Sequence, residues 1–383
     1  MPRARVVRSL KEWINEGVIL PGQPLPAERE LAQTLGVTRN TVRRALEMLD
    51  AEGVLRSQNG RARIVRETQA RGGLLENAIA VLTVASDQPW VGHRQSGWSE
   101  YIAHGALHAA RQTGRHAVAL QPQRLADNDI YRLIAERPCG VIITDIKSWT
   151  TQALQWAQAL QHAGLPVVLY GNQTDSVYDR VTSDHESGAY QLTRWLIEAG
   201  RRHPLNVWPQ MPMGLGYWFP HRRAGYERAM EEAALKPLPP LTATILDAEF
   251  IGRDEFEENV RCLSELLKPY FNQKRPVDAI MASSDGDTFA LAAACRLCGC
   301  EPGKDVLIVG YDNYWGDSTA RQWESAIPAA TIDKRNPSMG AALVELLLQR
   351  AQNQLPRTPQ RRVVEPELVI LGSDEASGSG VNR

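Results

Sequence analysis

The sequence predicts an α/β protein with a small, separate domain at its N-terminus. Two observations carry this prediction. From residue 78 onward, short apolar runs rich in β-branched residues alternate with helical stretches, a pattern typical of βαβ units and parallel sheets. Residues 1–66 lack that alternation and instead show short helical patterns followed by a hairpin.

Length and composition exclude several classes of protein. The chain has 383 residues, which suits two or three domains, and its 43% hydrophobic and 23% charged residues are ordinary for a globular protein. No apolar run is long enough to cross a bilayer and the N-terminus lacks the pattern of an export signal, so we expect a cytoplasmic protein without membrane contact. The cysteine count is odd, which favours reduced thiols over a disulfide framework; the five are Cys139, Cys262, Cys295, Cys298 and Cys300.

Charge is distributed unevenly along the chain. Residues 1–66 contain 12 Lys and Arg against 7 Asp and Glu, whereas the remainder contains 31 against 37. A basic head on an acidic body is expected when only one end of a protein meets nucleic acid.

The chain divides into four segments. Residues 1–66 form the basic domain, and residues 67–77, which have little apolar periodicity, form a linker. Residues 78–372 form the α/β body, and the small, polar residues 373–383 form a flexible tail.

The basic domain has the pattern of a helix-turn-helix. Pro26 suits the first position of one helix, which Gly36 ends, and Thr38 is a good N-cap for the next helix. That next helix buries an apolar stripe and turns Arg39, Asn40 and Arg43 towards solvent. Because arginine suits guanine edges and phosphates, we expect the start of this helix to enter the major groove of DNA.

A basic hairpin follows the second of these helices. Asn59–Gly60 between two strand-like runs predicts a tight turn, with Arg61 and Arg63 at or beside its tip and available to phosphates or the minor groove. The alternative is a plain helical domain with a solvated basic face. The order of helix, turn, helix and basic hairpin favours DNA binding over that alternative.

This region resembles the winged helix of GntR-type transcription regulators, through PAERELAQTLGVTRNTVRRALEMLDAEGVLRSQNGRARIV. Asn40 stands where the family commonly has a small hydroxyl residue. The resemblance implies operator DNA as a partner, contacted from both helices and the wing by Arg29, Thr38, Arg39, Asn40, Thr41, Arg43, Asn59, Gly60 and Arg61.

Polar and aromatic residues of the body gather where its predicted strands end. Parallel sheets bind ligands at the carboxyl ends of their strands, so these positions are the candidate binding residues. Carboxylates, an amide, an arginine and aromatic rings suit a polyhydroxylated ligand, although any one of them could instead be a helix cap or a surface ion pair. The candidates are Asp87, Trp90, Asp145, Asn172, Arg222, Phe250, Ser284, Asp285 and Asp312.

The body resembles the effector-binding core of LacI-type regulators, which is similar to periplasmic sugar-binding proteins. The segments that carry the resemblance include AGLPVVLYGN, RRAGYERAMEEAAL, VLIVGYDN, PAATIDKRNPSMGAALVELLL and VVEPELVI. It implies two α/β lobes crossed three times by the chain, with a carbohydrate-like effector between them. Arg222 and Asp312 match the residues that clamp a sugar's hydroxyls, Ser284 replaces a frequent asparagine, and Phe250 lies near the usual stacking aromatic.

Two departures from the LacI pattern stand out: Gly171 replaces a frequent aspartate, and QPWVGHRQSGW lengthens the first connection. A GntR-type head on a LacI-type body is similar to the arrangement of the arabinose-responsive repressors.

Other motifs do not predict a cofactor, a metal or catalysis. Cys295, Cys298 and Cys300 lack the fourth ligand of a zinc site and are expected to be buried thiols. The sequence contains no phosphate loop, dinucleotide fingerprint or nucleophile motif. No acidic residue stands at a sequence spacing that predicts a pair with His185 or His221, so both histidines are expected to be solvated or to cap helices.

The leading interpretation is a cytoplasmic, homodimeric, DNA-binding transcription regulator, expected to be a repressor, whose operator affinity is set by a small carbohydrate-like effector. The alternative is a sugar-binding or carbohydrate-processing protein with an incidental basic head. The missing export signal and catalytic constellation favour the regulator.

Overall fold

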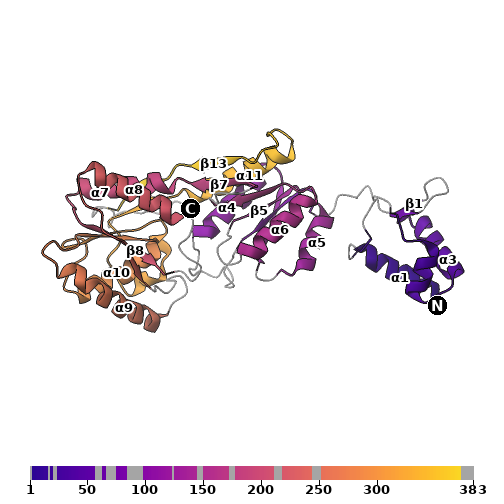
Figure 1. The fold of residues 1–383 in the computed structure, drawn as a ribbon, viewed down its shortest axis with the longest axis horizontal. Coiled ribbons are helices and arrows are strands. Elements are labelled where there is room, and N and C mark those ends of the chain that lie inside the picture. Colours follow the sequence, from indigo (N-terminus) through magenta and orange to yellow (C-terminus); the bar gives the residue numbers. More distant parts are fainter. Residues whose placement is uncertain are drawn as a thin grey trace.

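A computed structural model describes residues 2–15, 18–19, 24–56, 63–65, 75–83, 98–122, 125–144, 150–171, 177–210, 218–243 and 252–371. They form a small head and a body of two α/β lobes (Figure 1). The predicted fold class, an N-terminal helix-turn-helix domain with a body of parallel sheets, is confirmed. None of the helices in the described ranges is both long and apolar enough to span a bilayer.

The described residues of the head form three helices and a pair of short antiparallel strands: α1 (Pro2–Asn15), α2 (Glu28–Leu35), α3 (Arg39–Ala51), β1 (Leu55–Arg56) and β2 (Ile64–Val65). Apolar side chains from all three helices, including Leu10, Leu31 and Leu46, meet in one buried core. This core fixes the angle at which α3 is presented, because α3 packs against both α1 and α2.

The turn between α2 and α3 has the predicted chemistry. Gly36 ends α2 in the left-handed region, with φ 63°, and the Thr38 hydroxyl accepts a hydrogen bond from the Thr41 N–H at 3.3 Å. The predicted start of α2 is wrong by two residues. The helix begins at Glu28 rather than Pro26, because Ala27 is the N-cap residue and its N–H donates to Glu30 Oε2.

The first lobe of the body, which we call the N-lobe, is built on a parallel sheet with the strand order β13-β7-β6-β5-β3-β4. Alternate strand residues face opposite helix layers: Ile79 and Val81 pack with α4 and α11, whereas Ala80 and Leu82 pack with α5 and α6. The elements are β3 (Ala78–Leu82), α4 (Trp98–Gln112), β4 (His116–Leu120), α5 (Asp127–Glu136), β5 (Gly140–Ile143), α6 (Thr150–His162), β6 (Val167–Tyr170), β7 (Asp179–Ser183), α11 (Asn336–Ala351) and β13 (Arg361–Val364).

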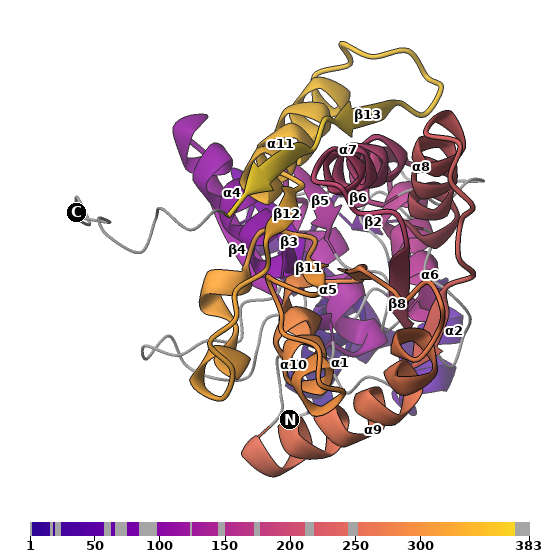
Figure 2. The same cartoon turned by 90° about the vertical axis from the view of Figure 1, so that its left-hand side faces the viewer.

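The C-lobe repeats this architecture with the strand order β14-β12-β11-β10-β8-β9, in which only β14 runs antiparallel to its neighbour. Figure 2 shows α7 beside α8 in this lobe and α4 beside α11 in the other. The elements are α7 (His185–Glu198), β8 (Pro204–Pro209), α8 (Trp218–Glu232), β9 (Leu241–Ala243), α9 (Arg253–Phe271), β10 (Ala279–Ala282), α10 (Asp285–Leu297), β11 (Leu307–Val309), the 3₁₀ helices η2 (Trp315–Asp317) and η3 (Thr319–Gln322), β12 (Ala330–Asp333) and β14 (Glu367–Ile370).

The chain crosses between the lobes three times, as the LacI resemblance implies. It crosses at Asp184 after β7, at 334–335 after β12, and at 365–366 after β13. The first and third crossings touch, because the Asp184 N–H donates to the Val364 carbonyl. A further contact joins the lobes where the Tyr101 hydroxyl of α4 bonds the Asp317 carboxylate of η2.

Candidate DNA-binding surface and effector site

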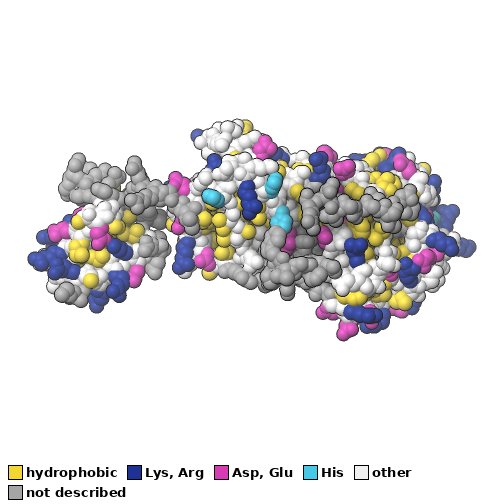
Figure 3. Space-filling view, turned by 180° about the vertical axis from the view of Figure 1, so that it is seen from behind, with side chains coloured by type: hydrophobic (Ala, Val, Ile, Leu, Met, Phe, Trp, Pro, Cys, Tyr) yellow, Lys and Arg dark blue, Asp and Glu magenta, His cyan; other side chains and the backbone are white. Residues whose placement is uncertain are grey.

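The predicted recognition helix is α3, and its first turns present the predicted residues. Arg39, Asn40 and Arg43 are exposed, and the Thr38 and Thr41 hydroxyls lie 2.9 Å apart at the helix start. Arg29 is exposed on the first turn of α2. Basic side chains gather on the head, as Figure 3 shows at its left-hand end. The surface therefore offers donors to an acceptor-rich groove.

The wing is described only at its base. Asn59, Gly60 and Arg61 lie outside the described residues and stay predictions. Arg63 differs from its predicted role as a phosphate contact: its guanidinium pairs with Asp50, at 2.7 Å between Nε and Oδ2, and with Glu28, at 3.3 Å between Nη1 and Oε1. Arg63 directly precedes β2, and these two carboxylates hold its side chain against the head.

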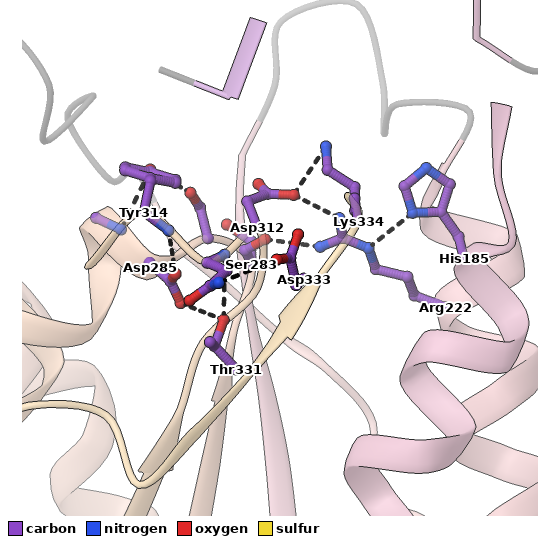
Figure 4. Close-up of polar contacts among 12 residues, drawn as sticks. His185, Arg222, Ser283, Asp285, Asp312, Tyr314, Thr331, Asp333 and Lys334 are labelled. Atoms are coloured by element: carbon purple, nitrogen blue, oxygen red, sulfur yellow. Dashed lines mark hydrogen bonds and ion pairs between the residues drawn. The ribbon is translucent and has the colours of Figure 1, made fainter. Parts of the chain in front are cut away.

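Two of the predicted effector residues, Arg222 and Asp312, come together where strands of the C-lobe end. Together with Lys334, His185 and Ser283 they form what we call the Asp312 cluster (Figure 4). Asp312 follows β11 and Lys334 follows β12; their side chains are 5% and 3% exposed, with 2.8 Å between Lys334 Nζ and Asp312 Oδ1. The pair is buried at the second crossing between the lobes, so two charged groups lie where the chain passes from one lobe to the other.

Arg222 is fixed on several sides. Its guanidinium lies 3.4 Å from the ring centroid of Tyr311 and 4.5 Å from that of Trp218. Nη1 donates to the Ser283 carbonyl at 2.7 Å, Nε donates to His185 Nδ1 at 3.4 Å, and Nη2 lies 3.9 Å from Asp312 Oδ1. Such stacking and bonding hold the planar fork of an arginine in one orientation.

Asp312 keeps one oxygen for another partner. Lys334 and Arg222 approach Oδ1 as cations, but neither carboxylate oxygen receives a hydrogen bond within the described part of the chain. An ionised carboxylate accepts hydrogen bonds only. The cluster is therefore arranged to accept a hydrogen bond from a hydroxyl group brought to Oδ2.

Asp285 plays a different part from Asp312, because its carboxylate faces the protein interior. It is fully buried: Oδ2 accepts from the Tyr314 and Trp315 N–H groups at 2.8 and 3.2 Å, and Oδ1 bonds the Thr331 hydroxyl at 2.7 Å. Burial is the main cause that raises the pKa of Asp285 to about 8; the charge of Asp312 acts in the same direction, and the hydrogen bonds from these donors act against it. Its contacts anchor the loop that carries Asp312.

That loop needs an anchor because its backbone is strained. Asp312 and Asn313 both have positive φ, at 95° and 54°, a region that side chains other than glycine rarely occupy. Asn313 Nδ2 donates to Asp333 Oδ2 at 3.1 Å, and Ser284 at the loop's other side bonds the Tyr314 hydroxyl. Asp285 and Ser284 thus both stabilise the loop, while their predicted effector contacts stay predictions.

The remaining predicted effector residues, Asp87, Trp90, Asp145, Asn172 and Phe250, lie outside the described residues. Lys334 was missed, although it follows the run ATID and the same strand-end rule would have selected it. The expectation that His185 is solvated or caps a helix is wrong. It is buried as the first residue of α7, whose N-cap is Asp184, and it receives the Arg222 hydrogen bond. Its position directly after β7 carried no signal that the chain changes lobes there.

The expectation of buried thiols holds fully for one of the three clustered cysteines. Cys295 is buried on α10, and Cys298 and Cys300 are half-buried just beyond it. Burial raises the pKa of all three thiols, which disfavours the thiolate form.

Comparison with known families defines the class of protein. Residues 2–65 match the family described as bacterial regulatory proteins, gntR family, and residues 193–373 match the periplasmic binding protein-like domain. The chain is a DNA-binding transcription regulator that joins a GntR-type head to a periplasmic-binding-protein-like body. Both predicted resemblances are thereby confirmed.

Individual proteins match most of the chain. The chain is 23% identical to the arabinose metabolism transcriptional repressor of Geobacillus stearothermophilus, over 96% of this chain and 95% of that protein. A LacI-family regulatory protein from Chloroflexus aggregans has a similar structure, with a TM-score of 0.60, 20% identity and coverage of 78% of this chain and 99% of that one. A complex of the transcriptional regulator CelR with cellobiose has a TM-score of 0.56 and 20% identity, covering 90% of this chain and 99% of that chain.

Proposed function

We propose that this regulator is a repressor whose effector is a polyhydroxylated sugar held by Arg222, Asp312 and Lys334. The observation that carries the proposal is the buried Asp312 carboxylate, fixed on one oxygen by two cations and open to a donor on the other. A sugar hydroxyl donates to Oδ2, and the stacked Arg222 and the Trp218 ring supply a rigid polar and apolar wall. Repressors of arabinose and sucrose metabolism among its relatives, and the cellobiose complex, support this class of ligand.

In this proposal, the effector acts by changing the orientation of the two lobes relative to each other. Lys334 lies on the second crossing and Asp312 on the C-lobe, so a ligand at this pair touches both the hinge and one lobe. A ligand that binds a closed arrangement better than an open one shifts the population of lobes towards closure. In a homodimer, closure moves the two linkers and hence the spacing of the two heads on a two-fold operator, which lowers operator affinity.

The same proposal assigns the operator contacts to Arg29, Thr38, Arg39, Asn40, Thr41 and Arg43 and to the wing, and places the protein in the cytoplasm with its DNA. It assigns no catalytic role to the chain. A gel shift on DNA from upstream of its own gene, with and without arabinose, sucrose and cellobiose, separates this function from that of a carbohydrate-processing protein.

One pair of variants tests the effector site directly. Arg222→Ala is expected to abolish the response of operator binding to the sugar while leaving operator affinity in the sugar-free state unchanged. Arg223→Ala is the matched control, because Arg223 is the next residue of α8 but is exposed and pairs with Glu227. Asp312→Ala should behave like Arg222→Ala. Wild-type sugar affinity by calorimetry in folded Arg222→Ala and Asp312→Ala would contradict the assigned site.

A further inference from the structure

A network of four charged side chains joins the parts of the head that are expected to meet DNA. Glu28 at the start of α2 accepts from Arg43 of α3, at 3.1 Å between Oε2 and Nη2, and from Arg63 at the base of the wing. Arg63 also pairs with Asp50 near the end of α3. We call these residues the Glu28 network: Glu28, Arg43, Asp50 and Arg63.

Glu28 is held in place from its inner side. Its side chain is 23% exposed, and the half-buried Arg63, itself fixed by Asp50, occupies one face of the carboxylate. Hydrogen bonding from Arg43 lowers the pKa of Glu28, so the carboxylate is ionised at neutral pH. An isolated surface ion pair rearranges freely, whereas a network shared by three elements restrains each member.

Arg43 is the one arginine of the network that faces outward. Its side chain is 55% exposed, and it meets Glu28 through Nε and Nη2, at 3.5 and 3.1 Å. A guanidinium has five N–H donors in a planar fork, so the edge that carries Nη1 is left for a second acceptor. Guanine offers O6 and N7 in the major groove as a matching pair of acceptors.

We propose that Glu28 is a positioning residue that fixes Arg43 so that Arg43 reads one guanine of the operator. The carboxylate holds one edge of the guanidinium and thereby aims the other edge from the recognition helix into the groove. Base discrimination at that position then depends on Glu28 although Glu28 touches no base. The inference rests on the proposed role of α3 in DNA recognition.

The test uses the full-length protein and an operator obtained by selecting random DNA for binding. Affinity is measured for that operator and for a set in which each G·C pair is replaced in turn. Glu28→Gln keeps the shape of the side chain but removes the charge and one acceptor. We expect discrimination at one G·C position to fall about tenfold in Glu28→Gln, and Arg43→Lys to lose discrimination at the same position, because an ammonium cannot bond both acceptors in the same plane.

Glu47→Gln is the matched control. Glu47 lies one helical turn from Arg43 and acts on it through charge alone, whereas Glu28 also hydrogen-bonds it. Both glutamine variants remove one negative charge near DNA and should gain similar affinity for unrelated sequences, but Glu47→Gln should keep the wild-type pattern of discrimination. The double variant Glu28→Gln/Arg43→Lys should lose no more discrimination than Arg43→Lys alone, since the two residues act as one unit.

Two results would overturn the proposal. One is wild-type discrimination in folded Glu28→Gln at the position where Arg43→Lys loses it. The other is an equal loss at every position, which would indicate a merely loosened head. Should Glu28→Gln not fold, Glu28→Asp replaces it: the shorter carboxylate cannot hold both arginines in the same geometry, and unchanged discrimination would again contradict the inference. If selection yields no preferred sequence, or if Arg39→Ala and Arg43→Ala leave affinity unchanged, the assignment of α3 fails as well.

Discussion

Replacing Gly310 by alanine perturbs the loop that carries Asp312 without replacing any charged residue. Gly310 directly follows β11, and a Cβ atom there would lie 1.8 Å from Asp285 Oδ1. That carboxylate cannot simply rotate away, because its two oxygens bond the Thr331 hydroxyl and two backbone N–H groups. The methyl group therefore forces Asp285 out of the contacts that anchor the strained loop.

The size of the effect follows from two contributions. Inserting a methyl group into a filled core costs about 1–3 kcal/mol, and leaving a buried hydrogen-bonding group without its partner costs about 1–3 kcal/mol more. We therefore expect Gly310→Ala to lower the free energy of unfolding by about 2–6 kcal/mol. Backbone strain adds nothing, because Gly310 is not among the residues with positive φ.

Urea titration of the effector-free protein measures this change. Gly316→Ala is the matched control, because its new Cβ atom meets no atom within 4 Å and its φ is not positive. That control should stay within about 0.5 kcal/mol of the wild type. If Gly310→Ala were as stable as Gly316→Ala, the Asp285 carboxylate would not occupy the place described here, and its role as the loop anchor would be refuted.

Three further predictions concern other charged groups. Lys334→Met should lower the free energy of unfolding by about 3 kcal/mol, because it removes the nearest cation from the buried Asp312. The double variant Lys334→Met/Asp312→Leu should recover most of that loss in the same urea titration. A Lys334→Met variant as stable as the wild type would contradict the burial of the pair. Because the pKa of Asp285 is raised from 3.8 to about 8 in the folded protein, its contribution to stability is fully present below 3.8 and is lost as the pH rises towards 8. Asp285→Asn should remove this dependence, so parallel stability profiles of variant and wild type between those pH values would disprove the shift. Arg39→Ala should weaken operator binding in a gel shift by about 1–3 kcal/mol, mainly at one operator position, with effector binding retained; equal affinity would remove Arg39 from the DNA contacts.

Local chemistry made the head predictable from its sequence. Gly36 in the left-handed region and the Thr38 cap are decided by neighbouring residues, so the turn between α2 and α3 follows from the chain itself. The Glu28 network, in contrast, could not be predicted from the sequence. Arg63 lies 35 residues from Glu28, and no periodic pattern links a wing residue to a helix start.

The body shows the same contrast between local and long-range order. Alternating strands and helices predicted parallel sheets, and the LacI resemblance implied their division into two lobes. The strand-end rule selected Arg222 and Asp312 as neighbours of a ligand. Sequence alone could not separate Asp312 from Asp285, since both follow apolar strands. Burial and donors decide between them: Asp285 receives two backbone N–H groups, whereas Asp312 faces Lys334.

The order in which the strands enter the sheets has a consequence for synthesis of the protein. The last two strands, β13 and β14, follow one another in the chain, yet each completes the edge of a different lobe. The N-lobe sheet therefore lacks its edge strand until the ribosome has made residue 364, and the C-lobe sheet until it has made residue 370, long after the head has its whole sequence. A nascent chain can therefore fold its DNA-binding head before either lobe that regulates the head is complete. Deletion of residues 361–370 alone would remove an edge strand from both lobes at once.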